Sequence, residues 1–130
     1  MGAALGFAPS FAHDYAGTNP HEAGHVKLGK GPVICNSSLA NKKVNDLLKT
    51  CAREHNIPFQ VESYMGSTHT DTDKIHFSGK GVVTSLVSLP LRYMHSPSEV
   101  CHLDDIENSI ALLAQFLCSI DETFNPDPFC

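Results

Sequence analysis

Apolar and polar residues alternate along this chain in blocks that predict strands and helices in turn. Three largely apolar stretches predict strands, at residues 32–38, 59–65 and 82–91. The last of these is almost entirely apolar or small, which is typical of a strand covered on both faces. A shorter strand is predicted at residues 10–14, where the sequence SFAHD passes from apolar to polar.

Helical spacing of apolar residues predicts two longer helices. The first covers about residues 39–55, with Ser38 as its N-cap and Pro58 just past its end. The second covers about residues 105–120, and Asp104 followed by Glu107 marks its start. The apolar positions of the first helix are Leu39, Val44, Leu47, Leu48, Cys51 and Ala52, and those on one face of the second are Ile106, Ile110, Leu113 and Leu117.

The order of predicted elements is strand, strand, helix, strand, short helix near residues 73–78, strand, helix. This alternation predicts an α/β fold in layers, with at least some parallel pairing in the sheet. We interpret the 130 residues as a single domain, with a leader over residues 1–10 and a tail over residues 121–130. In such sheets ligands bind at the carboxyl ends of strands, and Asp14 and His95 both come just after a predicted strand.

Composition excludes several classes of protein. The net charge is −5 and the nine Lys and Arg residues are scattered, which argues against nucleic acid as a partner. No apolar run approaches the roughly 20 residues that span a bilayer, so we expect no membrane partner. The five cysteines are widely spaced without a CxxC pair, which argues against a disulfide scaffold and indicates a reducing cytoplasm.

Histidine and acidic residues supply the candidate chemistry. Asp14 and His95 suit a metal site, although taken singly each is more often an ordinary residue, Asp14 as a turn cap and His95 as a loop residue. His21 and His25 are four residues apart, but the surrounding Gly and Pro residues favour a loop over a metal-binding helix. The segment HTDTDKIH either holds a cation, orients a substrate or is a polar loop with an Asx turn. The segment GKGPV lacks the spacing of a phosphate-binding loop and precedes a strand.

Several stretches, taken together and in order, closely resemble one enzyme family. They are HVKLGKGPVIC, IPFQVE, THTDTDKIHFSGKGVVTSLVSLPLRYMHSPSEV and LDDIENSIALLAQFL. They resemble the C-terminal part of the di-zinc glutamyl and deblocking aminopeptidases, the tetrahedral aminopeptidases, some of which were once labelled cellulases or endoglucanases. The resemblance runs from about residue 11 to residue 117 and implies the layered α/β/α partial sheet of a zinc-exopeptidase-like catalytic domain.

The resemblance also implies site residues. The motif FAHD places Asp14, and the motif RYMHSP places His95, at ligands of the family's two zinc or cobalt ions, of which this chain binds one or none. Two such ions polarise a peptide carbonyl and activate a bridging water, whose proton a Glu accepts. We expect four further residues to line the substrate pocket: Thr70, Asp71, Asp73 and Arg92.

The resemblance leaves part of the family's machinery unmatched. The family's other ligands and its catalytic Glu lie upstream of the matched part, and no two Glu residues are adjacent here. We therefore expect a portion of an aminopeptidase with little activity alone, which forms a homo-oligomer or pairs with a complementing N-terminal fragment. Two other hypotheses stay open: a non-catalytic assembly module that keeps the fold, and a simple metal-binding protein.

Overall fold

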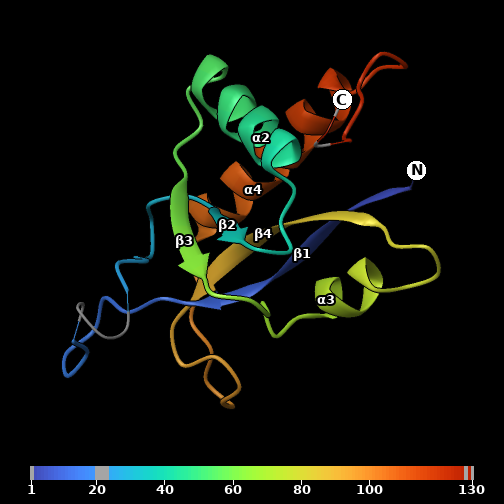
Figure 1. Ribbon diagram of the computed structural model, residues 1–130. Coiled ribbons are helices and arrows are strands. Elements are labelled where there is room, and N and C mark those ends of the chain that lie inside the picture. Colours follow the sequence, from blue (N-terminus) through green and yellow to red (C-terminus); the bar gives the residue numbers. More distant parts are fainter. Residues whose placement is uncertain (1, 20–23, 128, 130) are drawn as a thin grey trace.

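The computed structural model describes residues 2–19, 24–127 and 129, which form a four-stranded sheet with three helices (Figure 1). The strands are β1 (Ala3–Phe11), β2 (Val33–Ser37), β3 (Gln60–Tyr64) and β4 (Val83–Leu91), in the sheet order β1-β4-β2-β3. The helices are α2 (Lys42–Glu54), α3 (Asp71–His76) and α4 (Leu103–Ser119). Every helix of the described residues is too short or too polar to cross a bilayer.

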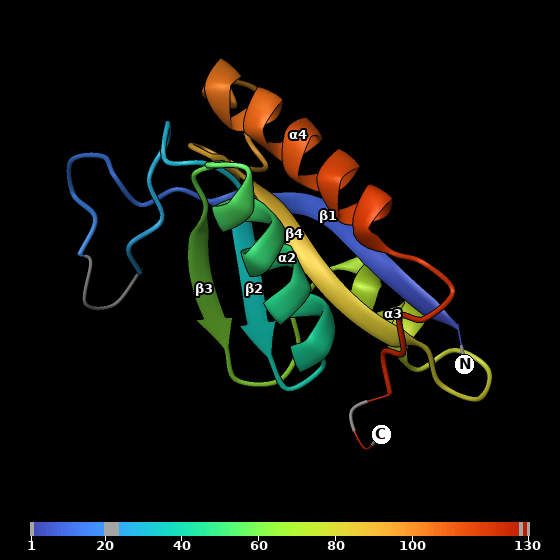
Figure 2. The ribbon, with the colours of Figure 1, turned by 90° about the horizontal axis from the view of Figure 1, so that it is seen from above.

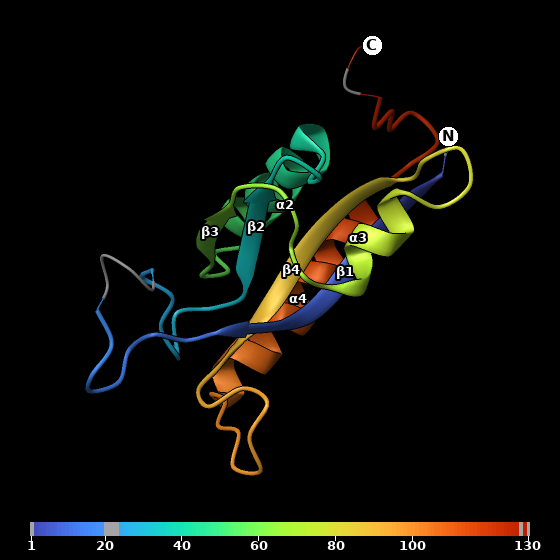
Figure 3. The ribbon, with the colours of Figure 1, turned by 60° about the horizontal axis from the view of Figure 1, so that its bottom comes forward.

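The helices cover both faces of the sheet. Helices α2 and α4 lie next to each other on one face, as Figure 2 shows, and α3 lies on the opposite face against β1 and β4 (Figure 3). The main core fills the space between the sheet and the first pair of helices. Its buried members are Ile34, Val44, Leu48, Cys51, Ala52, Ile57, Val87, Leu112 and Phe116. The three layers confirm the predicted layered α/β/α fold.

Strand β4 is central and organises the sheet. It pairs in parallel with β1 and antiparallel with β2, and β2 in turn pairs in parallel with β3. Residues 84–88 of β4 are each no more than 2% exposed, as expected for a strand covered on both faces. Because β2 runs against β1 and β4, the turn that leads into β2 lies at the same end of the sheet as the carboxyl ends of β1 and β4.

The first strand lies elsewhere than the sequence pattern predicts. We expected it over residues 10–14, whereas β1 covers Ala3–Phe11 and pairs with β4 from Ala3↔Val83 to Phe11↔Leu91. The segment AALGFAPSF is poor in β-branched residues, so its propensity for a strand is weak, and the long ladder with β4 stabilises it instead. Residues 3–10, which we treated as part of a leader, thus belong to the sheet.

The helix starts also differ from their predictions. Helix α2 is capped by Asn41, whose Oδ1 accepts the Val44 N–H at 3.1 Å, rather than by Ser38. Helix α4 is capped by His102, whose Nδ1 accepts the Asp104 N–H at 3.2 Å. Histidine is not among the preferred N-cap residues, so the pattern around Asp104 suggested a later start.

The face of α4 that packs on the sheet is not the predicted apolar stripe. Its buried residues are Asp105, Ser109, Leu112 and Phe116, two of which are polar. From the predicted stripe, Ile110 is 63% and Leu117 is 66% exposed. Cys118 is also exposed, although Cys51 of α2 is buried as expected. Asp105 on the buried face bonds through both side-chain oxygens to the turn before β2.

We expect Gly31→Ala to be severely destabilising. Gly31 lies in the turn before β2 with φ of +90°, and a Cβ there would lie 2.0 Å from the carbonyl oxygen of Pro58. The clash adds to the backbone strain, so the free energy of unfolding should fall by more than about 3 kcal/mol. Gly17 is the matched control, because it has φ of +92° but nothing within 4 Å of a Cβ. Gly17→Ala should cost only about 1–2 kcal/mol. Equal losses in urea unfolding would contradict this prediction.

Candidate functional site

The segments that follow β1 and β4 remain in contact just beyond the ends of the two strands, before their loops diverge (Figure 3). The Ala12 N–H donates to the Leu91 carbonyl at 2.7 Å. Further on, the rings of Tyr15 and Tyr93 lie 5.4 Å apart. The two parallel strands therefore deliver their following residues, Asp14 among them, to one end of the sheet, which is where α/β folds bind ligands.

Asp14 is held at two points. Its Oδ1 accepts the Arg92 Nε–H at 2.8 Å, and its Oδ2 accepts the backbone N–H of Leu28 at 3.0 Å. The Asp14 side chain is only 14% exposed. The hydrogen bond from Arg92 is the main cause that lowers the pKa of Asp14, and the Leu28 bond adds to it against the opposing effect of burial. Asp14 thus presents an ionised, oriented carboxylate.

His95 lies in the left-handed backbone region that non-glycine residues rarely adopt, with φ of +66°. Its backbone N–H donates to Glu99 Oε1 at 2.7 Å, which closes the turn around Pro97. The His95 ring makes an edge contact with Phe11, with ring centroids 6.4 Å apart. Phe11 also stacks on His13 at 6.2 Å, so this one ring connects the residue before Asp14 to His95.

A surface pocket of about 720 Å³ opens beside His95. Three of the expected lining residues, Thr70, Asp71 and Asp73, lie in its wall together with His95. Arg92 is not among the lining residues, because its guanidinium lies on Asp14 instead. Asp14 is also not among the lining residues. Further lining residues are Ala8, Pro9, Ser10, Phe11, Tyr64, Thr68, His69, Lys74 and Met94.

The loop before α3 is shaped by Asp73. Its two carboxylate oxygens accept hydrogen bonds from Ser67 Oγ, from the backbone and hydroxyl of Thr68, and from the His69 N–H. Burial raises the pKa of Asp73, but these bonds outweigh it and hold the pKa at about 2. Asp73 is therefore engaged in holding the wall of the pocket. Asp71 is exposed and forms a surface ion pair with Lys74, whose Nζ lies 3.7 Å from its Oδ1.

A partly buried polar contact beside the pocket cannot be predicted from the sequence pattern. Ser10 of β1 donates through Oγ to Oε1 of Glu62 in β3 at 2.7 Å. Burial is the main cause that raises the pKa of the nearby Tyr64 to about 12, so its phenol stays protonated near neutral pH. These residues belong to strands whose polar positions look like solvent-facing ones, and only the tertiary pairing brings them together.

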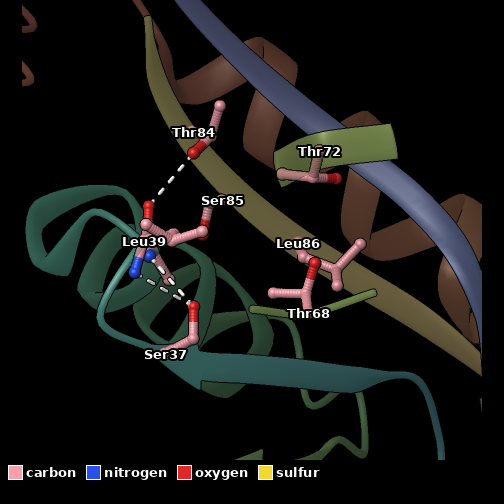
Figure 4. A pocket seen from close by; sticks show the side chains of 8 residues that line it. Ser37, Leu39, Thr68, Thr72, Thr84, Ser85 and Leu86 are labelled. Atoms are coloured by element: carbon pink, nitrogen blue, oxygen red, sulfur yellow. Dashed lines mark hydrogen bonds between the residues drawn. The ribbon is translucent and has the colours of Figure 1, made fainter. Parts of the chain in front are cut away.

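The other hollows and histidines do not extend this site. Figure 4 shows a tight hollow between the loop after β2 and helix α3, which is lined by hydroxyl groups and leaves no room for a water molecule. His76 lines a separate pocket of about 530 Å³ and bonds through Nδ1 to Thr84 Oγ1 at 3.0 Å, so it does not join His69. Of the suggested pair, His25 is exposed and His21 lies outside the described residues.

Asp14 and His95 are of the right kind for a metal but do not complete a site together. A carboxylate and an imidazole are ordinary ligands of zinc. Two hydrogen bonds fix the orientation of the Asp14 carboxylate, and each of its oxygens keeps a further lone pair as an acceptor. Within residues 2–19, 24–127 and 129, however, no three His, Cys, Asp or Glu side chains gather where they could hold an ion. The two residues therefore fit as part of a ligand set.

Comparison with known proteins identifies aminopeptidases as relatives of this chain. The lysyl aminopeptidase of Pyrococcus furiosus is 35% identical over 100 residues, which are 75% of this chain and 29% of the relative. The TET aminopeptidase of a marine sediment Thaumarchaeota archaeon superposes with a TM-score of 0.83 at 29% identity, over 92% of this chain and 34% of that one. The TET1 peptidase of Pyrococcus horikoshii, which can assemble into a tetrahedron or a large octahedral shell, has a TM-score of 0.61 at 28% identity, over 87% and 32%.

By its fold, the chain is an α/β domain of the aminopeptidase type. The M42 glutamyl aminopeptidase family model matches residues 3–112, and the chain belongs to this family of peptidase hydrolases. The match starts at residue 3 and so includes strand β1, which our sequence analysis left outside the resemblance. The aligned part of the chain spans about a third of the length of the relatives it matches.

We expect Asp73 to make stability depend on acid. Its folded pKa of about 2 lies below its usual value of 3.8, so its contribution is complete above about pH 4 and is lost as the pH falls toward 2. In urea unfolding, the free energy of unfolding of wild type should fall by roughly 1–2 kcal/mol more than that of Asp73→Asn as the pH is lowered from 4 to 2. Asp71→Asn is the control, because it removes an exposed carboxylate from the same loop. Identical pH profiles for wild type and Asp73→Asn would refute the assignment.

Proposed function

We propose that this chain forms part of a metal-dependent aminopeptidase that removes N-terminal residues from peptides. The observation that carries the proposal is the meeting of the segments after β1 and β4, which brings Asp14 and the pocket-lining His95 to one end of the sheet. Membership in the M42 family supports the reaction class. The relatives are named aminopeptidases, and such enzymes hydrolyse the peptide bond next to a free N-terminus.

Asp14 and His95 would each ligate a divalent ion, zinc or cobalt, and the complete site would hold two. Such ions, when bound, polarise the peptide carbonyl and supply an activated water. Other residues of this chain fix the orientation of the Asp14 ligand. Arg92 and the Leu28 N–H hold the Asp14 carboxylate, and the low pKa of Asp14 keeps it ionised for a cation over the whole neutral range.

The pocket beside His95 would bind the substrate. Phe11, Tyr64 and Met94 give it apolar surface, while the exposed Asp71 supplies a negative charge at its wall. A carboxylate in this place attracts a protonated peptide N-terminus, and the apolar surface accommodates a side chain. Thr70 caps α3 through its Oγ1, which accepts the Thr72 N–H at 3.3 Å, and so keeps Asp71 at the start of that helix.

The partner of this chain would be a copy of itself or a complementing N-terminal segment of the same enzyme. The exposed apolar residues of α4, Leu103, Ile110 and Leu117, are more than 60% exposed and support association. The self-assembly of the TET1 peptidase of Pyrococcus horikoshii supports a homo-oligomer. The same apolar surface favours the second candidate function, a non-catalytic assembly module.

We propose the cytoplasm as the compartment. The described cysteines Cys35, Cys51, Cys101 and Cys118 are all free thiols, which is the state that a reducing compartment maintains.

Zinc titration by calorimetry tests the ligand assignment. We expect the wild-type chain to bind Zn²⁺, and we expect His95→Ala and Asp14→Ala to weaken binding at least about tenfold, because each removes a direct ligand. His55→Ala is the matched control, since it removes an exposed histidine at the end of α2. Loss of affinity in His55→Ala, or unchanged affinity in His95→Ala, would favour the assembly module over the enzyme.

Hydrolysis of aminoacyl-p-nitroanilides in the presence of Co²⁺ or Zn²⁺ tests whether this chain is active by itself. We expect little or no turnover by the 130-residue chain alone, because a two-metal centre needs more ligands than Asp14 and His95 provide. A rate well above that of the buffer with metal, lost in His95→Ala, would show instead that this chain holds a complete site.

A further inference from the structure

We propose that Asp105 is a positioning residue that orients the Asp14 carboxylate through the backbone turn between them. The inference rests on the proposed function, because it takes Asp14 as a metal ligand. Asp105 does not touch the pocket. It acts on Asp14 through the segment Leu28 to Gly31, which lies between the start of α4 and the end of β1.

The first link is the contact between Asp105 and the turn. Asp105 is fully buried, and its two side-chain oxygens bond to two neighbouring backbone amides of the same turn. Oδ2 accepts the Gly29 N–H and Oδ1 accepts the Gly31 N–H, each at 2.7 Å. A group that accepts two short bonds in a buried place fixes the direction of both amides, because losing either bond leaves a buried polar atom without a partner.

The second link is the rigidity of the turn. A Cβ on Gly31 would lie 2.0 Å from the Pro58 carbonyl oxygen, and one on Gly29 would lie 3.2 Å from the His102 ring. Both glycines have positive φ, +73° for Gly29 and +90° for Gly31. The turn is therefore enclosed on two sides, which accounts for a glycine on each side of Lys30.

The third link is the contact between the turn and Asp14. Leu28 directly precedes Gly29, and its N–H donates to Asp14 Oδ2 at 3.0 Å. Arg92 holds the other oxygen, Oδ1, from the side of β4. One bond alone lets a carboxylate pivot about its donor, whereas two donors on different oxygens set the plane of the group. Outer partners of this kind orient metal ligands and commonly change metal affinity by about 10–100-fold.

The chemistry requires an aspartate at position 105. Two acceptor oxygens on a short side chain match two amides that are two residues apart. An asparagine offers one acceptor and directs its NH₂ group toward the other N–H. Asp105→Asn therefore disturbs the turn with almost no change in volume, which makes it the informative substitution.

The test is amide hydrogen exchange and carbon-13 NMR on the metal-free 130-residue chain. In Asp105→Asn, we expect the exchange protection of the Leu28 amide to fall at least tenfold more than that of the Val87 amide in central strand β4. We also expect the Asp14 side-chain carbonyl resonance to shift. Ser109→Ala is the matched control: it removes a buried hydroxyl from the same helix face, bonded to the Asp105 carbonyl, and leaves the side-chain bonds in place.

A purely structural role for Asp105 predicts a different result. In that case, Leu28 and Val87 lose protection by the same factor and the Asp14 resonance stays in place, which overturns the proposal. If Asp105→Asn does not fold, Asp14→Asn tests the same coupling by removing the contact between Asp14 and the turn. Coupling through the turn predicts lower protection of the Gly29 and Gly31 amides, and unchanged protection overturns it. Because no metal is present, these outcomes are independent of the zinc titration that tests the proposed function.

Discussion

The parallel pairing of β1 with β4 is the constraint on which the rest of the structure depends. The ladder runs over nine residues from Ala3↔Val83 to Phe11↔Leu91, so the two strands end together. The segments that follow stay in contact through the Ala12–Leu91 hydrogen bond and the ion pair between Asp14 and Arg92. A carboxylate and an imidazole that are 81 positions apart in sequence thereby reach the same end of one sheet, and the proposed ligand assignment rests on this placement.

The antiparallel pairing of β2 with β4 brings a second segment, the turn before β2, to the site. Because β2 begins where β1 and β4 end, the turn at Gly29 and Gly31 lies within hydrogen-bonding reach of both Asp14 and the start of α4. Helix α4 then packs through a face that includes the buried Asp105 and Ser109, and its more apolar residues Ile110 and Leu117 stay exposed. The buried face of this helix therefore includes polar contacts, in which Asp105 accepts the amides of the turn and Ser109 donates to the Asp105 carbonyl.

The site combines two kinds of acidic residue. Asp14 and Asp73 have lowered pKa values because hydrogen bonds stabilise their ionised forms, and both are committed to holding nearby segments. Asp71 is exposed and faces the pocket. The proposed roles rest on this difference, with the ordered carboxylate of Asp14 assigned to a cation and the exposed one of Asp71 to the ammonium group of a peptide.

The sequence by itself determined the α/β alternation, the buried central strand, the apolar face of α2 and, through its motifs, the family and the candidate ligands. These features are local, since they depend on periodicity within one element or on residues that are close along the chain. Only the tertiary structure decided where β1 lies, which face of α4 is buried, and that Arg92 belongs with Asp14 rather than in the pocket wall. Each of these depends on a partner far away in sequence: β4 for a strand of weak propensity, Gly29 and Gly31 for Asp105, and the end of β1 for Arg92. A pattern of residue types does not specify such partners. The same side chain can lie in solvent, cap a helix or form a buried hydrogen bond, and the tertiary structure decides which.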